Sequence, residues 1–348
     1  MIKQRSPIRV GVAGWSYPDW AGVVYPGKRA RGGLSELAYL ARYLDAIEIN
    51  TTFYHPPASE ISAKWVAQVA DRPEFLFTAK LWQRFTHARE QPWTRAEARM
   101  FSDGIEPLRE AGRLGALLMQ FPWSFKPAEA ERDWLARLAE QFSRFPCVVE
   151  VRHCDWNTPE NLEFFRALGL GFCNIDQPRL GGNLPATNLV TGPAGYYRFH
   201  GRNAKAWFSA SPQFRGGHSE RSEVSFPRRT PSCMQPLRFA QGDRLAGAIL
   251  PLETEGMRRS AHAGRDERYN YLYSEKELAP WVEQIGAAAA EGKAQQMFVI
   301  ANNHYKGQAV VNALEVKSRL SGKLVPVPGP LLEAYPALEE YAARTGLF

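Results

Sequence analysis

Residues 147–176 read CVVEVRHCDWNTPENLEFFRALGLGFCNID. The stretch begins and ends with short apolar runs, at 147–152 and 170–176, which are typical of buried strands. PENLEFFRAL between them has the apolar spacing of a helix, and Pro159 after Thr158 suits its first turn. A strand, a helix and a second strand in this order indicate a parallel β-α-β unit.

The same alternation continues along most of the chain. Strands are predicted at residues 8–14, 46–50, 75–80, 115–121, 147–152, 170–176, 195–201 and 296–303. Helices are predicted at 34–44, 61–70, 95–111, 128–142, 159–168, 277–292 and 307–320, whereas 176–195 is predicted to be a loop. Eight strands without a glycine-rich dinucleotide fingerprint favour a (β/α)8 TIM-type barrel, a single α/β domain over residues 1–348, over a doubly wound sheet.

Residues 209–262 interrupt this alternation. The segment is rich in Arg, Ser, Pro and Gly and shows no sustained helix or strand period. An irregular segment of this length inside a barrel is unusual, and it is typically either functional or disordered. It also resembles a mobile repeat translated in frame. We therefore interpret it as a low-order insertion between the seventh strand and the next helix, with a functional lid as the alternative.

Composition favours a cytoplasmic protein that has no membrane partner. The beginning of the chain, MIKQRSPIRV, lacks a signal-peptide core, and no apolar run approaches the roughly 18 residues of a membrane span. The four cysteines are widely spaced and are predicted to be reduced thiols. A net charge of +7 on 348 residues is a weak electrostatic signal for nucleic acid.

Four predicted strands end in polar side chains that are two residues apart. The pairs are Glu48 and Asn50, Glu150 and Arg152, Asn174 and Asp176, and Arg198 and His200. Side chains two apart on a strand share one face, and buried charges need partners. Because chemistry in (β/α)8 barrels occurs at the carboxyl ends of the strands, we expect one shared polar site there.

Glu48 and Glu150 are the candidates for general acid and base, since burial or mutual repulsion of two carboxyl groups can raise their pKa values. The alternative is structural: Arg152 and Arg198 neutralise the two carboxylates as ion pairs. The sequence favours a catalytic or ligand-binding role for Glu150 and leaves the ion pairing open.

Cationic and imidazole groups surround these carboxylates in the sequence. His200 lies between Arg198 and Arg202, which suits a bound anion such as phosphate. Lys80 ends the third predicted strand and is either a Schiff-base lysine or a phosphate-binding one, and His87 adds a second imidazole.

Two further features belong to the predicted rim. Asn302 and Asn303 precede the last helix, in a donor-rich corner where barrels often hold phosphate. Six tryptophans follow predicted strands, Trp15 among them, and they either stack on a substrate or pack the loops onto the rim.

No cofactor is predicted. Glu48, Glu150, Asp176 and His200 would be the natural ligands of a divalent metal gathered from separate strands. The neighbouring arginines compete for the same carboxylates, so a metal is the weaker alternative.

At this point the motifs carry a resemblance to a known family. GVAGWSYPDW, AIEINTTFYHPP, FTAK, VVEVRHCDW, YYRFHGR, YNYLYSEKEL and ANNHYKGQAVVNAL resemble the YecE-like family, also called domain of unknown function 72, over about residues 8–320 apart from the insertion. The resemblance implies a (β/α)8 barrel and no particular reaction. The matching pattern residues include Glu48, Asn50, Lys80, His87, Gln120, Glu150, Arg152, Asp176, Arg198, His200, Arg202, Asn302 and Asn303. The sequence departs from the pattern at Ala301, where a bulky residue is usual, and in the insertion.

The leading functional hypothesis is a hydrolase-like acid-base enzyme that acts on a phosphate-bearing or nucleic-acid-like anionic substrate. In this hypothesis Arg152, Arg198, Arg202 and Lys80 hold the anion, Glu48 and Glu150 move protons, and His200 is an acid, a base or a ligand. The alternative is a non-catalytic nucleic-acid or nucleotide-binding barrel, and a third hypothesis is a chain inactivated by its insertion. The sequence leaves the oligomeric state open.

Overall fold

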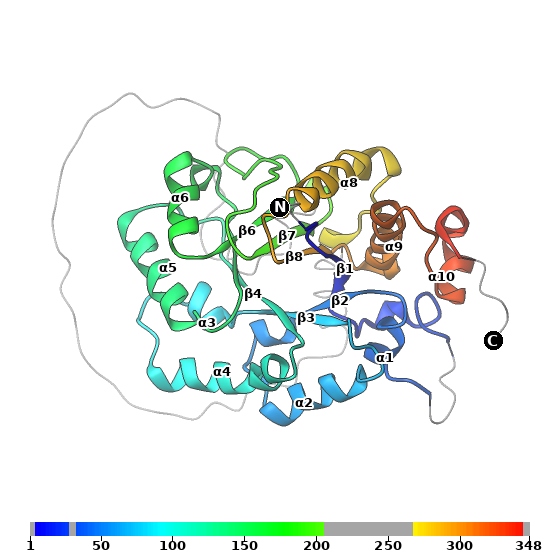
Figure 1. Ribbon diagram of the computed structural model, residues 1–348, viewed down its shortest axis with the longest axis horizontal. Helices are drawn as coiled ribbons and strands as arrows, with labels where there is room; N and C mark the ends of the chain where they lie inside the picture. The colour runs from blue at the N-terminus through cyan, green and yellow to red at the C-terminus, as the bar shows by residue number, and fades with distance from the viewer. Residues whose placement is uncertain (1–3, 28–32, 205–266, 344–348) are drawn as a thin grey trace, which may run out of the picture.

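The computed structural model describes residues 4–27, 33–204 and 267–343. Eight parallel strands form a closed barrel in chain order, and β8 pairs with β1 (Figure 1). The predicted (β/α)8 barrel is thereby confirmed. The predicted insertion at 209–262 lies outside the described residues.

All eight predicted strands are present. They are β1 Ile8–Ala13, β2 Ala46–Ile49, β3 Leu76–Lys80, β4 Leu114–Gln120, β5 Cys147–Glu150, β6 Gly171–Asp176, β7 Ala194–Phe199 and β8 Gln296–Ala301. Several predicted runs extend past the carboxyl end of the strand, so Arg152 and His200 lie two residues and one residue beyond β5 and β7. The strands end earlier because inter-strand pairing stops before the apolar pattern does.

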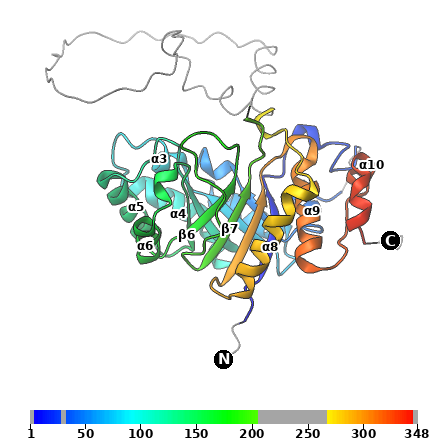
Figure 2. The same cartoon turned by 90° about the horizontal axis from the view of Figure 1, so that it is seen from above.

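Helices cover the outside of the barrel (Figure 1; Figure 2). They are α1 Glu36–Leu40, α2 Ser59–Gln68, α3 Gln83–Thr86, α4 Arg95–Glu110, α5 Glu129–Gln141, α6 Pro159–Ala167, α8 Glu275–Ala290, α9 Gln308–Ser321 and α10 Gly329–Ala334. Short 3-10 helices include η2 Thr51–Phe53, η3 Cys154–Trp156 and η6 Glu267–Tyr269. Residues 177–193, between β6 and β7, contain no helix, as predicted.

Local signals explain where several helices begin. Ser35 accepts a hydrogen bond from the backbone N–H of Ala38 at the start of α1, and Thr94 and Glu97 form a reciprocal capping box at the start of α4. Thr158 caps α6 immediately before Pro159. The sequence analysis did not predict α3 and α10, because four and six residues are too few to show a helical period.

The amino-terminal half of the barrel interior is apolar. Phe298 on β8 lies beside Tyr196 on β7, with ring centroids 5.8 Å apart. A Cβ atom added at Gly115 would lie 2.2 Å from the Phe298 ring, so only glycine fits there. This packing fills the barrel below Tyr196 and leaves the polar side chains at the carboxyl ends.

The described cysteines are free thiols, as predicted. Cys147 and Cys173 are buried and Cys154 is half-buried. Cys233 lies outside the described residues.

Candidate functional site

A chain of alternating charges crosses the interior at the carboxyl ends of the strands. Arg198 on β7 donates from Nη2 to Glu48 Oε1 on β2 at 2.7 Å, and from Nη1 to Glu150 Oε2 on β5 at 2.5 Å. Arg152 donates from Nη2 to the other oxygen of Glu150 at 2.6 Å. The ion pairing that the sequence left open is therefore present, and four predicted site residues form one network.

Burial separates this network into a sealed layer and a more accessible one. The side chains of Glu48 and Glu150 are 0% exposed and that of Arg198 is 2% exposed, whereas Arg152 is 13% exposed. Tyr196 also donates from its hydroxyl to Glu48 Oε2 at 2.9 Å. Glu48, Glu150 and Arg198 thus form a floor, above which Arg152 reaches toward solvent.

The charge state of Glu150 differs from the expectation of a raised carboxyl pKa. Burial by itself would raise this pKa, but the Arg198 and Arg152 guanidinium groups outweigh it and hold the pKa of Glu150 well below its ordinary value of 4.5. Glu150 is therefore an ionised carboxylate at neutral pH. It cannot act as a general acid unless a ligand displaces the arginines.

His200 is a neutral imidazole in this network. Its Nε2 lies 3.3 Å from Glu150 Oε1, and its Nδ1 lies 2.9 Å from Nδ2 of Asn302. Burial lowers the His200 pKa to about 3; the Glu150 carboxylate opposes this shift, and the Arg198 and Arg152 charges add to it. His200 and Asn302, two candidate residues at the ends of β7 and β8, are thus in contact.

Lys80, at the end of β3, lies beside the network with a different environment. Its Nζ donates to Gln120 Oε1 at 3.2 Å and lies 4.2 Å from the centroid of the Phe53 ring. Burial lowers the pKa of Lys80 from 10.5 to about 8, and the Arg198 guanidinium adds to this shift. Within the described ranges no carboxylate lies within ion-pair distance of Lys80.

His87 and Lys80 both pack against the Phe53 ring. The His87 and Phe53 ring centroids are 5.0 Å apart, and the Thr86 hydroxyl lies 2.9 Å from His87 Nδ1. Burial lowers the His87 pKa to about 4, and Lys80 and Arg152 lower it further. His87 is therefore neutral at pH 7.

Arg268, in η6, is a charged group near the mouth that sequence reasoning missed. Its guanidinium lies 5.9 Å from the centroid of the Tyr269 ring, burial lowers its pKa, and the charges of Tyr269, Arg152 and Glu150 act on it. No strand-end pattern could have identified this arginine, because it precedes α8 rather than following a strand. The only available signal was its position next to the conspicuous motif YNYLYSEKEL.

Asn50 and Trp15 lie at the opposite side of the mouth from β5. Asn50 is within hydrogen-bonding contact of the Tyr17 hydroxyl, which also donates to the Ala13 carbonyl at 2.6 Å. Trp15 is half-buried and packs edge-on against Trp65, with centroids 5.7 Å apart. Both residues form the wall of the mouth next to β1 and β2.

The prediction that all four strand-end pairs converge is wrong for Asn174 and Asp176. Asn174 donates to the carbonyl groups of Leu189 and Tyr196, outside the barrel interior. Asp176 accepts from Trp281 Nε1 of α8 at 2.7 Å. Every residue of β6 is buried, so the alternation identified residues that share a face without showing which face points inward.

Arg202 and Asp176 form a second, separate cluster. Arg202 donates to both oxygens of Asp176, at 2.8 Å and 2.5 Å, and to Glu277 of α8 at 3.1 Å. The Tyr273 hydroxyl donates to Asp176 at 3.1 Å. These contacts tie β6 to α8 and account for the hydrogen-bonding capacity of Asp176.

Asn302 and Asn303, which were predicted to form one donor-rich corner, have different partners. Asn303 points away from His200 and donates to the Tyr271 carbonyl at 2.7 Å and to Asn312 Oδ1 of α9 at 2.9 Å. Asn303 therefore anchors the segment before α8, and only Asn302 contacts the charged network.

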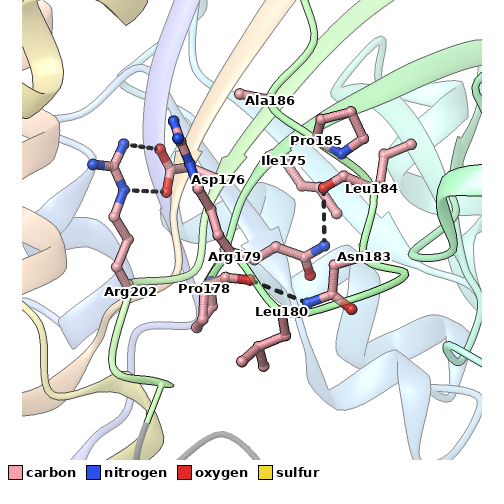
Figure 3. Close-up of a pocket in the computed structure, with 11 residues that line it drawn as sticks. Ile175, Asp176, Pro178, Arg179, Leu180, Asn183, Leu184, Pro185, Ala186 and Arg202 are labelled. Atoms are coloured by element: carbon pink, nitrogen blue, oxygen red, sulfur yellow. Dashed lines mark hydrogen bonds and ion pairs between the residues drawn. The ribbon is translucent and has the colours of Figure 1, made fainter.

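A pocket of about 400 Å³ lies beside the second cluster (Figure 3). It is lined by Ile175, Asp176, Gln177, Pro178, Arg179, Leu180, Asn183, Leu184, Pro185, Ala186 and Arg202. Within it Gln177 donates to the Leu184 carbonyl and Asn183 to the Pro178 carbonyl, so the loop after β6 is held by its own side chains. This pocket is distinct from the Glu48–Glu150 network.

The rim tryptophans mostly pack the loops. Trp20 and Trp156 are fully buried and donate to the carbonyl groups of His304 and Phe125. Trp123 is 44% exposed, with Lys126 over its ring. Trp207 lies outside the described residues.

The four residues considered for the weaker metal alternative do not meet at one point, because Asp176 belongs to the second cluster and both glutamates pair with arginines. A compact donor set within the described chain is His153, Cys154 and Asp155, whose ligand atoms lie within 4.8 Å of one another. His153, however, caps the start of η3 and already accepts from the backbone N–H of Asp155.

The network and its neighbours carry a surplus of positive charge. Arg152, Arg198 and Lys80 bring three cationic groups to the two carboxylates of Glu48 and Glu150, with His200 neutral. Such a mouth can bind an anion through Arg152 and Lys80 without leaving a carboxylate unpaired.

No helix in the described part of the chain is both long and apolar enough to span a bilayer.

The closed, parallel eight-stranded sheet with helices around it defines the class as a (β/α)8 barrel. The model of the family described as protein of unknown function DUF72 matches residues 9–333, and the chain belongs to this family. It is 24% identical to UPF0759 protein YunF of Bacillus subtilis over 319 residues, which is 89% of this chain and 93% of that protein. It is 30% identical to UPF0759 protein YecE of Escherichia coli K12 over 148 residues, 42% of this chain and 48% of that protein.

Two solved structures share the fold. A DUF72 family protein from Thermotoga maritima has a TM-score of 0.65 and 30% identity, and the match covers 90% of this chain and 99% of that one. A DUF72 family protein from Enterococcus faecalis has a TM-score of 0.65 at 22% identity, covering 90% of this chain and 95% of that one. The family resemblance predicted from the motifs is confirmed.

Proposed function

We propose that this protein is an acid-base enzyme that acts on a small anionic, phosphate-bearing substrate bound at the carboxyl-end mouth of the barrel. The observation that carries the proposal is the surplus of cations around Lys80, whose ammonium group has no carboxylate partner among the described residues. Enzymes tune lysine pKa values toward neutrality by burial and neighbouring charge, so that the amine can exchange protons near physiological pH.

The different burial of its members supports giving them different roles in the proposed function. Arg152 and Lys80 are the groups that can touch an anion, because Glu48, Glu150 and Arg198 lie beneath them with exposed fractions of 0 to 2%. In this proposal the glutamates and Arg198 position Arg152 and hold the local field, and Lys80 with His87 transfers protons. The hypothesis that Glu48 and Glu150 move protons remains untested, and it requires a ligand that displaces their arginine partners.

One observation favours the alternative of a non-catalytic binding barrel. Each of the two carboxylates is held by at least one arginine, and the depressed pKa of Glu150 means that this group supplies no proton in the ligand-free protein. A barrel that binds one nucleotide or sugar phosphate needs only the cations. Turnover is the property that separates the two functions.

A thermal-shift screen tests the proposal. Inorganic phosphate, ribose 5-phosphate, AMP and a short DNA oligonucleotide would be added to the full-length protein, to Arg152→Gln and to the matched control Arg166→Gln, whose side chain is 46% exposed on α6. We expect small phosphates to raise the melting temperature of the wild type and the control but not of Arg152→Gln. The absence of any shift in the wild type would contradict anion binding.

Salt dependence distinguishes a small anion from a polyanion. Binding of a single phosphate group loses little affinity between 50 and 200 mM salt, whereas a nucleic acid that contacts six or more phosphates loses roughly a thousandfold. The small positive surplus at the mouth predicts the shallow dependence.

A further inference from the structure

We propose that Lys80 forms an imine with the carbonyl carbon of its substrate, so that the substrate class is a small aldehyde, ketone or 2-oxo acid that carries a phosphate or carboxylate group. This inference rests on the proposed function, because the same mouth must recognise the anionic group. It adds the reaction type and the reacting atom.

The contacts of Lys80 leave its amine available. Gln120 Oε1 at 3.2 Å is a neutral acceptor that cannot take the proton, and the Phe53 ring at 4.2 Å covers one side of the ammonium group. Two other described lysines are held by carboxylates: Lys317 contacts Asp45 at 2.8 Å and Lys293 contacts Glu291 at 2.5 Å. Lys80 differs from them in lying at the barrel mouth beside two arginines.

The electrostatic surroundings favour the neutral, nucleophilic amine. With a pKa of about 8, half of the Lys80 side chains are neutral at that pH. An ordinary lysine has a pKa near 10.4, and only roughly 0.4% of it is neutral at the same pH. Desolvation beside other cations is an established means of activating an imine-forming lysine.

The step balances without an oxidant or reductant. The neutral Lys80 Nζ attacks the carbonyl carbon, the carbonyl π electrons pass to oxygen, and a proton moves from nitrogen to oxygen to give a carbinolamine. Protonation of the hydroxyl then expels water as the C=N bond forms. His87, on the same Phe53 ring, is the neighbouring group that can relay these protons, and Arg152 is placed to hold the anionic group.

The imine restores the positive charge near the carboxylates. A protonated imine is a cation, and the Glu48 and Glu150 charges act favourably on a cation at the Lys80 position. The floor of the site thus stabilises the charged intermediate, whereas the nearby arginines favour the neutral amine that begins the reaction.

Reductive trapping tests the inference. The full-length protein would be incubated with dihydroxyacetone phosphate or pyruvate and sodium cyanoborohydride, and the modified lysine located by peptide mass spectrometry. We expect a single reduced adduct on Lys80, formed about tenfold or more faster than on the exposed Lys64, because each pKa unit changes the neutral fraction about tenfold. Lys64→Arg should keep the adduct and Lys80→Arg should lose it.

Two controls accompany the trapping experiment. Dihydroxyacetone, which has no phosphate, should label Lys80 far more weakly than dihydroxyacetone phosphate, and equal labelling would overturn the assigned substrate class. If Lys80→Arg does not fold, the pH dependence of wild-type labelling replaces it, with a half-maximal rate expected near pH 8. Labelling spread over surface lysines would overturn the imine.

The same samples separate the two levels of the proposal. A thermal shift by inorganic phosphate without any Lys80 adduct from either anionic carbonyl overturns the imine and leaves the proposed anion-binding function standing. The absence of both the shift and the adduct overturns both.

Discussion

Replacing Glu150 by Gln removes one charge from the centre of the buried network while keeping the shape of the side chain. Arg198 would lose a carboxylate at 2.5 Å and Arg152 one at 2.6 Å, and the Glu150 side chain is 0% exposed, so water cannot replace it. Breaking a buried ion pair costs about 3 to 5 kcal/mol. We expect about 3 kcal/mol, since Arg198 keeps Glu48 and Arg152 is partly solvated.

Urea unfolding followed by tryptophan fluorescence measures this loss of unfolding free energy. The matched control is Glu163→Gln, whose side chain is 73% exposed and pairs with Arg166 at 3.2 Å. An exposed pair of this kind contributes about 0.5 kcal/mol or less. If Glu150→Gln destabilises the protein no more than Glu163→Gln does, the buried network is not the structural floor described here.

The pH dependence supplies a second signature of the same group. Because the folded pKa of Glu150 lies below the ordinary 4.5, its contribution to stability is present above pH 4.5 and is lost as the pH falls through the folded pKa. The difference between wild type and Glu150→Gln should therefore shrink below pH 4.5. A difference that grows on acidification would mean that the carboxyl group is protonated in the native protein.

Three further outcomes follow from the buried groups. Burial lowers the pKa values of His87, His200 and His304 from 6.5 to between about 3 and 4. The free energy of unfolding should therefore be highest above pH 6.5 and fall toward pH 5 by about 1 to 2 kcal/mol per histidine. Imidazole NMR resonances that titrate near pH 6.5 would contradict this. Lys80→Met should raise the melting temperature at pH 7, because it removes a desolvated ammonium group, and it should abolish the phosphate-induced shift. The gain in stability should vanish as the pH rises toward 10.5, where the lysine is neutral in both the folded and the unfolded protein. Calorimetry at pH 7 and pH 10 measures both effects, and a variant that is destabilised at pH 7 would refute the prediction. Asp176→Asn should lower the free energy of unfolding by about 2 to 4 kcal/mol, because it weakens the contacts of Asp176 with Arg202 and Trp281. Phosphate affinity should not change. Urea unfolding and calorimetric titration measure the two quantities, and a loss of affinity would connect the second cluster to the mouth.

The barrel could be predicted because its strands are short apolar runs that are buried on both faces. All residues of β2, β5, β6 and β7 are buried, and this composition is visible in the sequence. The ends of the strands were harder to predict, because Arg152 and His200 continue the polar alternation after inter-strand pairing has stopped. The family motifs reinforced the same conclusion.

The candidate site could be predicted only in part. The two-residue spacing correctly joined Glu150 with Arg152 and Arg198 with His200, because side-chain alternation is a local property. For Asn174 and Asp176 the same rule gave the wrong face, since α8 supplies Trp281 as an outward partner from more than a hundred residues away. The position of Arg268 depends on tertiary packing in the same way.

The pKa of Lys80 could not be predicted from the sequence, for an electrostatic reason. Its pKa depends on burial and on Arg198, which is distant in the chain and adjacent in the barrel. The sequence could name the lysine but not whether a carboxylate would neutralise it. The structure leaves the amine next to Gln120 and Phe53.

The central claim is that Lys80 is an activated amine within an anion-binding mouth. Competitive labelling of the full-length protein across a pH series, with peptide mass spectrometry, gives the pKa of Lys80 with and without inorganic phosphate. We expect a pKa of about 8 in the free protein and a rise when phosphate binds, since a nearby anion favours the ammonium form. A pKa at the ordinary value of 10.5 that does not respond to phosphate would contradict the claim.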